Sequence, residues 1–399
     1  MTPLEKLKRA FVTGTLIERT LKKIDVVVGN VSRKICYSHG RVDSHKIFMM
    51  TFDNAYSCNL RYVNEEILRR GLSYDVVWAA TGNLAYEKND FPSNVRLVKR
   101  GSYEMFQEMS TAKVWMDNAL NCVWYNMPKK KKQVYINTWH GSMGIKKLSG
   151  NDIWMKKAAR CNKITDYCIA NSTFEEKVYR TTFWPDAEIL KYGHARNDIL
   201  FDHAEIANKR EKVHQYYGIE PSCKIFLYAP TFRDNGTTPF AEIDFEALKN
   251  ALQERFHCKV CILVRLHFKN RKSTIFDGQA KDWLHDATMY PDMQELLAAA
   301  DMGLTDYSSW AYDFVLTRRP MFLYAPDIAD YDQERGFYYP LESTPFPLAN
   351  NNQELIESVR HFNQDEYINK VEIFLQERGC YEEGVASKRI VDKLEEIMG

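Results

Sequence analysis

No run of about 18 apolar residues occurs in the sequence, so no segment resembles a membrane-spanning helix. The G-x-G-x-x-G and G-x-x-x-x-G-K-[ST] motifs are also missing, which counts against dinucleotide-binding and P-loop sites. No internal repeat or low-complexity tract stands out. The formal net charge is +1, so the chain offers no global attraction for nucleic acid, and any basic surface must be local.

The cysteine pattern gives little support for disulfide bonds or for a metal site. The nine cysteines are irregularly spaced and odd in number, and no signal peptide is recognisable, which favours reduced thiols in a cytoplasmic protein. Cys258 and Cys261 form a C-x-x-C pair, but the pair coincides with an apolar, strand-like run at residues 259–266. No second Cys or His pair follows at zinc-finger spacing. Buried thiols are therefore expected, with a metal or redox site as the alternative.

The first 25 residues predict a basic amphipathic helix. Its apolar positions recur near helical spacing, and lysines and arginines fill the other faces: Leu4, Leu7, Phe11, Ile17, Leu21 and Ile24 against Lys6, Lys8, Arg9, Arg19, Lys22 and Lys23. Such a helix either lies on an anionic membrane or packs its apolar stripe on the core, and Gly14 interrupts it. The four lysines at 129–132 leave a similar choice between a solvated loop and an anion-attracting surface.

The rest of the chain alternates between apolar runs and helical patterns, and its 399 residues suggest two domains. Strands are expected at 46–51, 74–79, 113–116, 133–138 and 167–170, and then, after a mixed-charge helix at 204–217, at 224–229, 259–266, 302–305 and 320–324. This alternation predicts an α/β protein with two Rossmann-like domains whose parallel sheets face a central cleft. The expected divisions are an N-terminal helix (1–25), two domains (26–205 and 206–375) and a C-terminal helix (376–399).

Several expected strand ends of the second domain carry anion-binding side chains. Thr305 and Asp306 lead into Ser308 and Ser309 at a helix start, where free N–H groups and hydroxyls suit a phosphate or pyrophosphate. An ordinary serine cap is the alternative. Asp306 would repel a phosphate, so it is expected to orient hydroxyls or N–H groups.

Two further strand ends supply Thr231 with Arg233, and Arg265 with His267. A guanidinium pairs with phosphate oxygens in bidentate geometry. From the first domain, the strand at 133–138 delivers His140, followed by Gly141, toward the same cleft. A neutral imidazole there can accept a proton from an attacking hydroxyl, and a purely structural histidine is the alternative.

Together these motifs resemble the CDP-glycerol glycerophosphotransferase family of teichoic-acid and capsule synthesis. The resemblance covers roughly residues 45–340 in family order, through Thr51-Phe-Asp53-Asn54-Ala-Tyr56-Ser57, Thr138-Trp-His-Gly141, Gly193-His-Ala-Arg196-Asn197-Asp198, Tyr228-Ala-Pro-Thr-Phe-Arg233, Arg265-Leu-His267, Thr305-Asp-Tyr-Ser-Ser309 with Asp313, Arg319-Pro320-Met-Phe322, Asp327 and Arg335-Gly336.

The resemblance implies a GT-B-like fold in which the second domain holds a CDP-activated donor and the first holds the acceptor. It implies that His140 is the base, with Asp313 as a further catalytic carboxylate. It places the donor pyrophosphate and nucleotide at one set of residues, Thr231, Arg233, Arg265, His267, Thr305, Asp306, Ser308 and Ser309. The acceptor side comprises Asp53, Asn54, Gly141, Ser142 and Arg196.

The implied reaction moves glycerol phosphate, or a related polyol phosphate, from CDP-glycerol or CDP-ribitol to a hydroxyl and releases CMP. The expected acceptor is a lipid-linked saccharide or a polyol-phosphate polymer, reached from the cytoplasmic side of an anionic membrane surface. No metal or other cofactor is expected, because no acidic pair faces the two serines. A nucleotide-sugar glycosyltransferase and a non-catalytic, membrane-associated binding protein remain the alternatives.

The sequence also departs from the family pattern. Phe268 stands where the family usually has proline, Ala195 replaces another proline, and Ser142-Met-Gly-Ile-Lys146-Lys147 replaces a threonine-proline-lysine pattern. These differences leave open which polyol is transferred, which acceptor is used, and whether the enzyme acts as a primase or a polymerase.

Overall fold

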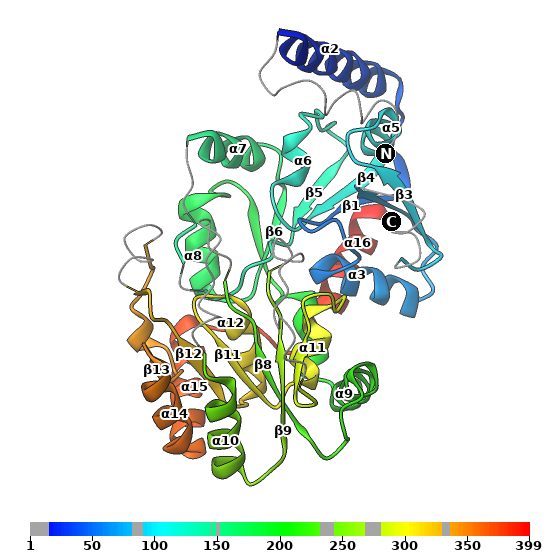
Figure 1. Cartoon of the computed structure of the whole chain (residues 1–399). Helices are drawn as coiled ribbons and strands as arrows, with labels where there is room; N and C mark the ends of the chain where they lie inside the picture. Colours follow the sequence, from blue (N-terminus) through cyan, green and yellow to red (C-terminus); the bar gives the residue numbers. More distant parts are fainter. Residues whose placement is uncertain are drawn as a thin grey trace.

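Two parallel β-sheets form the centres of two lobes, one above the other in Figure 1. The computed structural model describes residues 16–81, 91–144, 146–148, 152–231, 243–267, 281–328 and 336–399. Both sheets are parallel in every pair of neighbouring strands, as the strand–helix alternation predicts.

The first lobe is built on a seven-stranded sheet in the order β3-β2-β1-β4-β5-β6-β7. Its strands are β1 (Asp43–Met50), β2 (Asp75–Ala80), β3 (Val95–Lys99), β4 (Ala112–Asp117), β5 (Val134–Asn137), β6 (Tyr167–Ala170) and β7 (Glu188–Lys191). The helices around it are α2 (Leu16–His39), α3 (Cys58–Arg69), α5 (Tyr103–Thr111), α6 (Asn121–Trp124), α7 (Asp152–Asn162) and α8 (Thr173–Thr182). The buried parts of the central strands are apolar because helices cover both sheet faces; Phe48 of β1, between Val77 and Trp115, is fully buried.

The second lobe has a six-stranded sheet in the order β10-β9-β8-β11-β12-β13. Its strands are β8 (Lys224–Tyr228), β9 (Val260–Val264), β10 (Leu284–Asp286), β11 (Met302–Thr305), β12 (Met321–Tyr324) and β13 (Leu348–Ala349). The helices are α9 (His203–Tyr217), α10 (Phe245–Phe256), α11 (Met293–Ala299), α12 (Trp310–Phe314), α14 (Asn352–Arg360) and α15 (Gln364–Arg378). The strand order reverses between β8 and β11, and in open α/β sheets such a reversal opens a crevice at the carboxyl ends of the strands.

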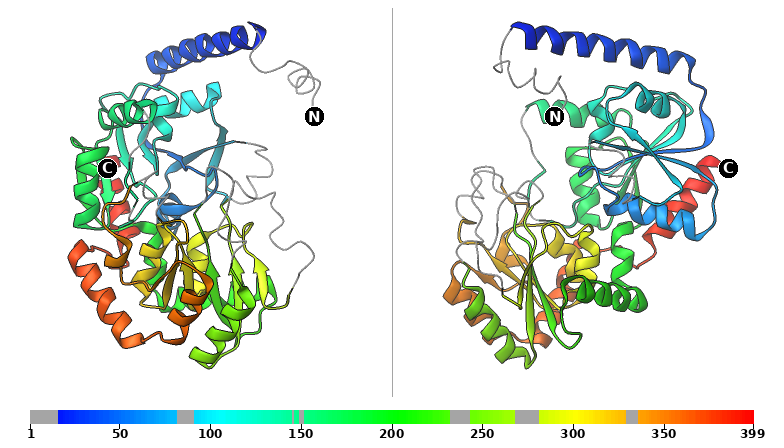
Figure 2. Two further views of the ribbon diagram at one scale, coloured as in Figure 1. Left: turned by 60° about the vertical axis from the view of Figure 1, so that its left-hand side comes forward. Right: turned by 45° about the vertical axis from the view of Figure 1, so that its right-hand side comes forward.

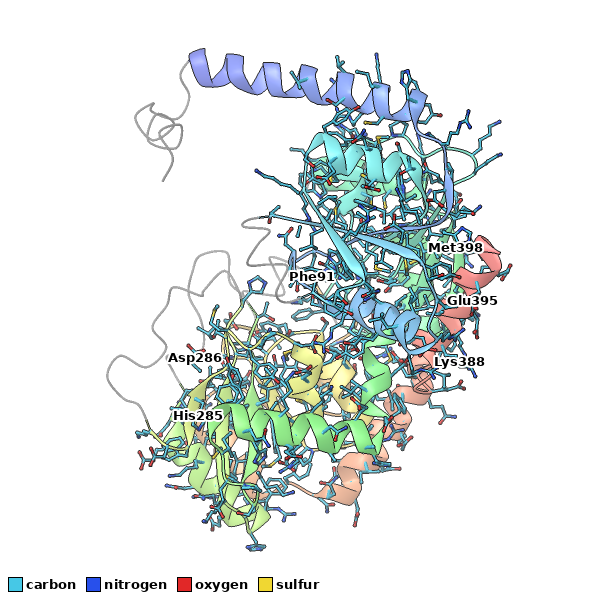
Figure 3. The ribbon with its side chains drawn as sticks, turned by 90° about the vertical axis from the view of Figure 1, so that its right-hand side faces the viewer. Phe91, His285, Asp286, Lys388, Glu395 and Met398 are labelled. Atoms are coloured by element: carbon cyan, nitrogen blue, oxygen red, sulfur yellow. The ribbon has the colours of Figure 1, made fainter. Side chains whose placement is uncertain are left out.

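The chain end returns to the first lobe. Helix α16 (Ala386–Met398) packs against α3 and the short 3-10 helix η1 (Ala195–Leu200), as the positions of Lys388, Glu395 and Met398 in Figure 3 show. Arg70 of α3 binds Glu395 at 2.6 Å and donates to the carbonyl of Lys388 at 2.9 Å. The Asp198 carboxylate of η1 accepts the first N–H groups of this helix. The chain therefore passes between the lobes twice, first from η1 to α9 and later from α15 to α16.

The N-terminal helix differs from the sequence prediction. Helix α2 continues to His39 instead of ending near residue 25, and residues 1–15 lie outside the described part of the chain. It lies across the end of the first lobe farthest from the second lobe, as both views in Figure 2 show. Cys36 docks its C-terminal half onto α5, whereas Val28, Val31 and Ile35 are exposed. None of the helices in the described ranges has the length and apolar character needed to cross a membrane.

All nine cysteines lie in the described part of the chain, and none forms a disulfide. Cys261 is buried in β9, where its sulfur lies 3.0 Å from that of Cys223, and Cys258 is half-buried. These positions match the expectation of structural thiols.

Candidate active site

A cavity of about 630 Å³ lies between the two lobes. The loop after β5 forms one side of it, and the loops after β8 and β11 form part of the other. Five of the residues predicted from the sequence line this cavity: His140, Gly141, Ser142, Thr231 and Ser309. Side chains from both lobes thus converge on one site.

His140 is held in one orientation by its neighbours. Its Nδ1 lies 2.6 Å from the carbonyl oxygen of Asn118. Since a carbonyl only accepts, Nδ1 carries the proton and Nε2 is left as the acceptor. The imidazole stacks on Phe52 and contacts the tilted ring of Trp139, with ring centroids 4.6 and 4.5 Å away.

The same surroundings keep the imidazole neutral. Burial lowers the pKa of His140 to about 4, and the positive charge of Arg196 and Lys146 acts in the same direction. The hydrogen bond to Asn118 opposes this shift but does not cancel it. At neutral pH, His140 is therefore in the form that can take a proton.

Gly141 has no room for a side chain. A Cβ atom here would lie 2.8 Å from Nε1 of Trp139. Its carbonyl accepts a hydrogen bond from Arg196, and Ser142 accepts one from Asn171 at 2.9 Å. The loop that presents His140 is thus fixed by contacts on both sides.

Arg196 and Asp313 lie behind this loop, not in the cavity. Their side chains are 4% and 5% exposed and form a bidentate pair between η1 and α12, with Nε–Oδ2 at 2.9 Å and Nη2–Oδ1 at 3.1 Å. Asn197 donates a further hydrogen bond to Asp313 at 3.1 Å. The structure places both side chains in this buried pair, outside the cavity wall, and the catalytic role of Asp313 and the acceptor-binding role of Arg196 stay predictions.

The segment around Asp306 shapes the second-lobe side of the cavity. One Asp306 oxygen accepts the backbone N–H groups of Thr231 and Tyr307, at 2.9 and 2.5 Å, which is the orienting role expected of it. Thr305 is fully buried and donates to the carbonyl of Ala229 at 2.7 Å, which joins the ends of β11 and β8. Thr305 and Asp306 therefore do not line the cavity.

The two serines separate in the structure. Ser309 precedes the first residue of α12, makes no capping hydrogen bond with its side chain, and lines the cavity. A Cβ atom on Gly144 would lie 3.4 Å from Cβ of Ser309, so the loop from the first lobe touches the start of α12. Ser308 is half-buried and is not part of the cavity wall.

Of the two predicted arginines, Arg265 lies in the described part of the chain and is not part of the cavity wall. Arg265 follows β9 and donates to the carbonyl of Tyr290 at 2.5 Å and to that of Ala287 at 3.3 Å, outside the cavity wall. His267 is half-buried at the edge of the described segment. Arg233 lies outside the described residues, so its place in the site stays a prediction.

Asp53 and Asn54 also lie outside the cavity wall, in the turn after β1. The Asp53 carboxylate accepts hydrogen bonds from Ser57 Oγ at 2.6 Å and from the N–H of Ala55 at 3.2 Å. Burial raises its pKa, although these hydrogen bonds act against the shift. Asn54 takes a left-handed conformation with φ of 62°. The turn places Phe52 against His140 and so supports the imidazole.

Sequence reasoning missed two cationic residues of the site, Lys146 and Lys147. Both line the cavity, and no predicted arginine within the described residues does so. They are brought there by contacts with the second lobe: Lys146 pairs with Phe337 in an antiparallel bridge, and the N–H of Lys147 donates to the carbonyl of Gly336 at 3.0 Å. The lysines were visible as a departure after Gly141, but only the pairing of distant segments shows that they face the cavity.

Comparisons with known proteins identify the family of this chain. A family model described as CDP-Glycerol:Poly(glycerophosphate) glycerophosphotransferase matches residues 33–396. A teichoic acid poly(glycerol phosphate) polymerase of Bacillus spizizenii is 31% identical over 380 residues, covering 87% of this chain and 91% of the relative. A teichoic acid glycerol-phosphate transferase of Staphylococcus aureus is 29% identical over 356 residues, covering 82% and 86%.

Longer relatives and solved structures also match. The chain covers 48% of a polymerase from Staphylococcus epidermidis at 30% identity, about half of that protein's length. Among solved structures, the wall teichoic acid polymerase TagF (H548A) superposes with a TM-score of 0.82 at 27% identity, over 96% of this chain and 97% of the other. A TagF H444N structure soaked with CDPG has a TM-score of 0.81 at 26% identity, over 96% and 97%.

Proposed function

Because this chain belongs to the CDP-glycerol:poly(glycerophosphate) glycerophosphotransferase family, we propose that the interlobe cavity is where it transfers a polyol phosphate from a CDP-activated donor to an acceptor hydroxyl. It is a transferase of the teichoic-acid type. The observation that carries the assignment of the site is His140, with Nδ1 bonded to Asn118 and Nε2 left as an acceptor in a cavity that both lobes line.

The reaction follows from these groups. The acceptor oxygen attacks the distal phosphorus of the donor, and its proton moves to Nε2 of His140. The new O–P bond forms as the bond between the two phosphates breaks, and CMP leaves with the electron pair. Lys146 and Lys147, with the hydroxyls of Thr231 and Ser309, offer cationic and neutral donors for the phosphate oxygens.

Donor binding also tunes the base. The free imidazole has a pKa of about 4, which makes it a weak base. A bound diphosphate brings negative charge close to it, and negative charge raises the pKa of a histidine. His140 thereby gains basicity when the donor is in place, which is when a proton must be taken.

The finer features of the function are part of the same proposal. The two parallel sheets and the returning helix α16 support a GT-B-like arrangement, with the donor on residues 206–375 and the acceptor on residues 26–205. Lysine cations supply the positive charge, so we propose that no metal or other cofactor is required. The relatives include enzymes named for glycerol phosphate and for ribitol phosphate, so both CDP-glycerol and CDP-ribitol are candidate donors.

The acceptor and the location belong to the proposal as well. The acceptor is a lipid-linked saccharide or a teichoic polymer, and the enzyme works at the inner face of an anionic membrane. The exposed apolar stripe of α2, formed by Val28, Val31 and Ile35, supports that location because an amphipathic helix can lie in a membrane interface.

A donor panel tests the function. The protein is incubated with CDP-glycerol, CDP-ribitol and a set of UDP-sugars, each with a glycerol-phosphate oligomer, and release of CMP or UDP is measured. We expect CMP from a CDP-polyol, and we expect the rate to persist in excess EDTA. Release of UDP alone would instead indicate a nucleotide-sugar glycosyltransferase.

A further inference from the structure

The loop that follows His140 is held by the second lobe at two points. The hydroxyl of Tyr339 donates to the carbonyl of Met143, and the N–H of Leu148 donates to the hydroxyl oxygen of Tyr338 at 3.0 Å. Both tyrosines belong to the second-lobe segment that pairs with the two cavity lysines. These two residues, the tyrosine clamp, therefore fix the loop on either side of its lysines.

The position of the tyrosine clamp is set by packing that involves both lobes. Phe174 of α8 contacts both rings edge-on, with centroids 5.7 Å from that of Tyr338 and 5.6 Å from that of Tyr339. The guanidinium of Arg378, at the end of α15, lies 3.9 Å from the centre of the Tyr339 ring. Contacts of both kinds are stabilising. Burial raises the pKa of Tyr339 well above its usual value, so its hydroxyl keeps the proton that it donates.

The loop inside the clamp carries the two lysines of the described cavity wall, Lys146 and Lys147. The stem of Lys147 passes over Gly336, where φ is 71° and a Cβ atom would lie 3.2 Å from Lys147 Cδ. A lysine side chain is long and flexible, so the reach of its ammonium group depends on where its backbone is held. The second lobe holds the backbone of these lysines, although they belong to the first.

Another polar contact between the lobes lies away from the cavity. Arg61 of α3 pairs with Asp292 at 3.1 Å and with Glu295 at 2.8 Å, and none of these three residues is part of the cavity wall. Tyr338 differs from them because it lines the cavity and its hydroxyl binds the lysine loop directly. Loss of that hydroxyl should therefore change donor binding and not only stability.

We propose that Tyr338 and Tyr339 are positioning residues that hold Lys146 and Lys147 toward the diphosphate of the donor. The cationic side of the cavity is then complete only while the second lobe holds the first-lobe loop. A donor that binds this held form alone stabilises it, so donor binding and the interlobe contact reinforce each other. The proposal rests on the transferase function proposed above.

Tyr338→Phe tests the clamp because it keeps the ring and removes only the acceptor of the Leu148 N–H. The loop is then in its binding position for a smaller fraction of the time, and the donor Kd rises in inverse proportion to that fraction. We expect calorimetry to give a Kd for CDP-glycerol about three- to tenfold above that of the wild type, with a similar rise in the donor KM for CMP release in the presence of a glycerol-phosphate oligomer. Saturating donor restores the loop, so kcat should stay within about twofold of the wild-type value.

Two further proteins complete the test. Tyr381→Phe is the matched control, because its hydroxyl lies 3.1 Å from Thr173 Oγ1 and so also joins α8 to the chain after α15, but outside the cavity wall. Its donor Kd should equal that of the wild type. In a double variant with Lys146→Gln and Lys147→Gln, adding Tyr338→Phe should change the donor Kd less than about twofold, because the clamp acts through these lysines.

The outcomes separate the clamp from the transferase function. A Tyr338→Phe protein with the wild-type donor Kd overturns the clamp, and so does an equal rise in Kd with and without the two lysines, because Tyr338 would then act by another route. In both cases, CMP release by the wild type still supports the transferase. Failure of the wild type to release CMP from any CDP-polyol with any acceptor overturns the transferase function and the clamp with it.

Discussion

At the scale of single residues, the chemistry of His140 depends on charges around it. The pKa of about 4 results first from burial and then from nearby cations, among which Arg196 and Lys146 are causes of the shift. The folded protein therefore holds this imidazole neutral at pH values where the unfolded chain protonates it, below about 6.5. Any stability linked to His140 is present above that pH and is lost as the pH falls toward 4.

Activity should follow the same titration. Transfer requires neutral His140, so kcat/KM for the donor should fall as the pH decreases. The acid limb of the kcat profile should lie at a higher pH than the acid limb of kcat/KM, because the bound diphosphate raises the pKa of His140. Lys146→Gln removes one of the cations that lower the pKa and should move the kcat/KM limb upward. Lys147→Gln is the control, since it removes a cavity lysine that is not among these causes. An acid limb that stays in place in Lys146→Gln would contradict the assignment of this limb to His140.

Residue roles could be predicted from the sequence only in part. The strand pattern indicated which loops reach the cleft, and so His140, Thr231 and Ser309 were identified correctly as cavity residues. The pattern does not indicate whether a side chain beside a strand end turns outward or inward. Asp313 turns into the core, where it pairs with an arginine more than one hundred positions away.

At the scale of secondary-structure elements, the central strands could be predicted from apolar runs in the sequence, and the edge strands could not. The nine expected strands coincide with β1, β2, β4, β5, β6, β8, β9, β11 and β12. These strands are apolar on both faces because helices cover them. The missed strands β3, β7, β10 and β13 are at sheet edges, where β3 and β7 include exposed as well as buried positions and β13 has two residues. Their sequences therefore lack a continuous apolar run.

The bidentate pair between η1 and α12 should be important for stability. Asp313→Ala leaves Arg196 as an unpaired buried charge, and breaking such a pair typically costs about 3–5 kcal/mol in the free energy of unfolding. Asp392→Ala, which removes a 55%-exposed partner of Arg70, should cost less than about 1 kcal/mol. Urea denaturation of both variants measures the difference, and equal losses would contradict the importance given to this buried pair for stability.

At the scale of the whole molecule, the position of α2 bears on the proposed membrane contact. Helix α2 lies across the far end of the first lobe (Figure 2). Its stripe of Val28, Val31 and Ile35 is exposed to solvent. Helices α6, α7 and α8, which contribute residues to the cavity wall, belong to the same lobe. The proposed membrane contact through α2 is therefore a contact of the first lobe.

Vesicle binding tests this orientation. The double variant Val28→Ser and Ile35→Ser removes apolar area from α2 and should reduce co-sedimentation with phosphatidylglycerol vesicles several-fold, since interfacial binding scales with buried apolar area. Ile373→Ser, a 47%-exposed position on α15 of the second lobe, should bind like the wild type. Unchanged binding by the double variant would remove α2 from the membrane contact.

The whole account depends on His140 as the base that faces the donor. His140→Ala should bind CDP-glycerol with a Kd close to that of the wild type, while single-turnover release of CMP slows about 10²- to 10⁴-fold. Rapid-quench measurement of CMP, with donor Kd from calorimetry on the same preparation, gives both values. A variant that releases CMP at the wild-type rate would contradict the account, because the imidazole would then have no part in the chemistry.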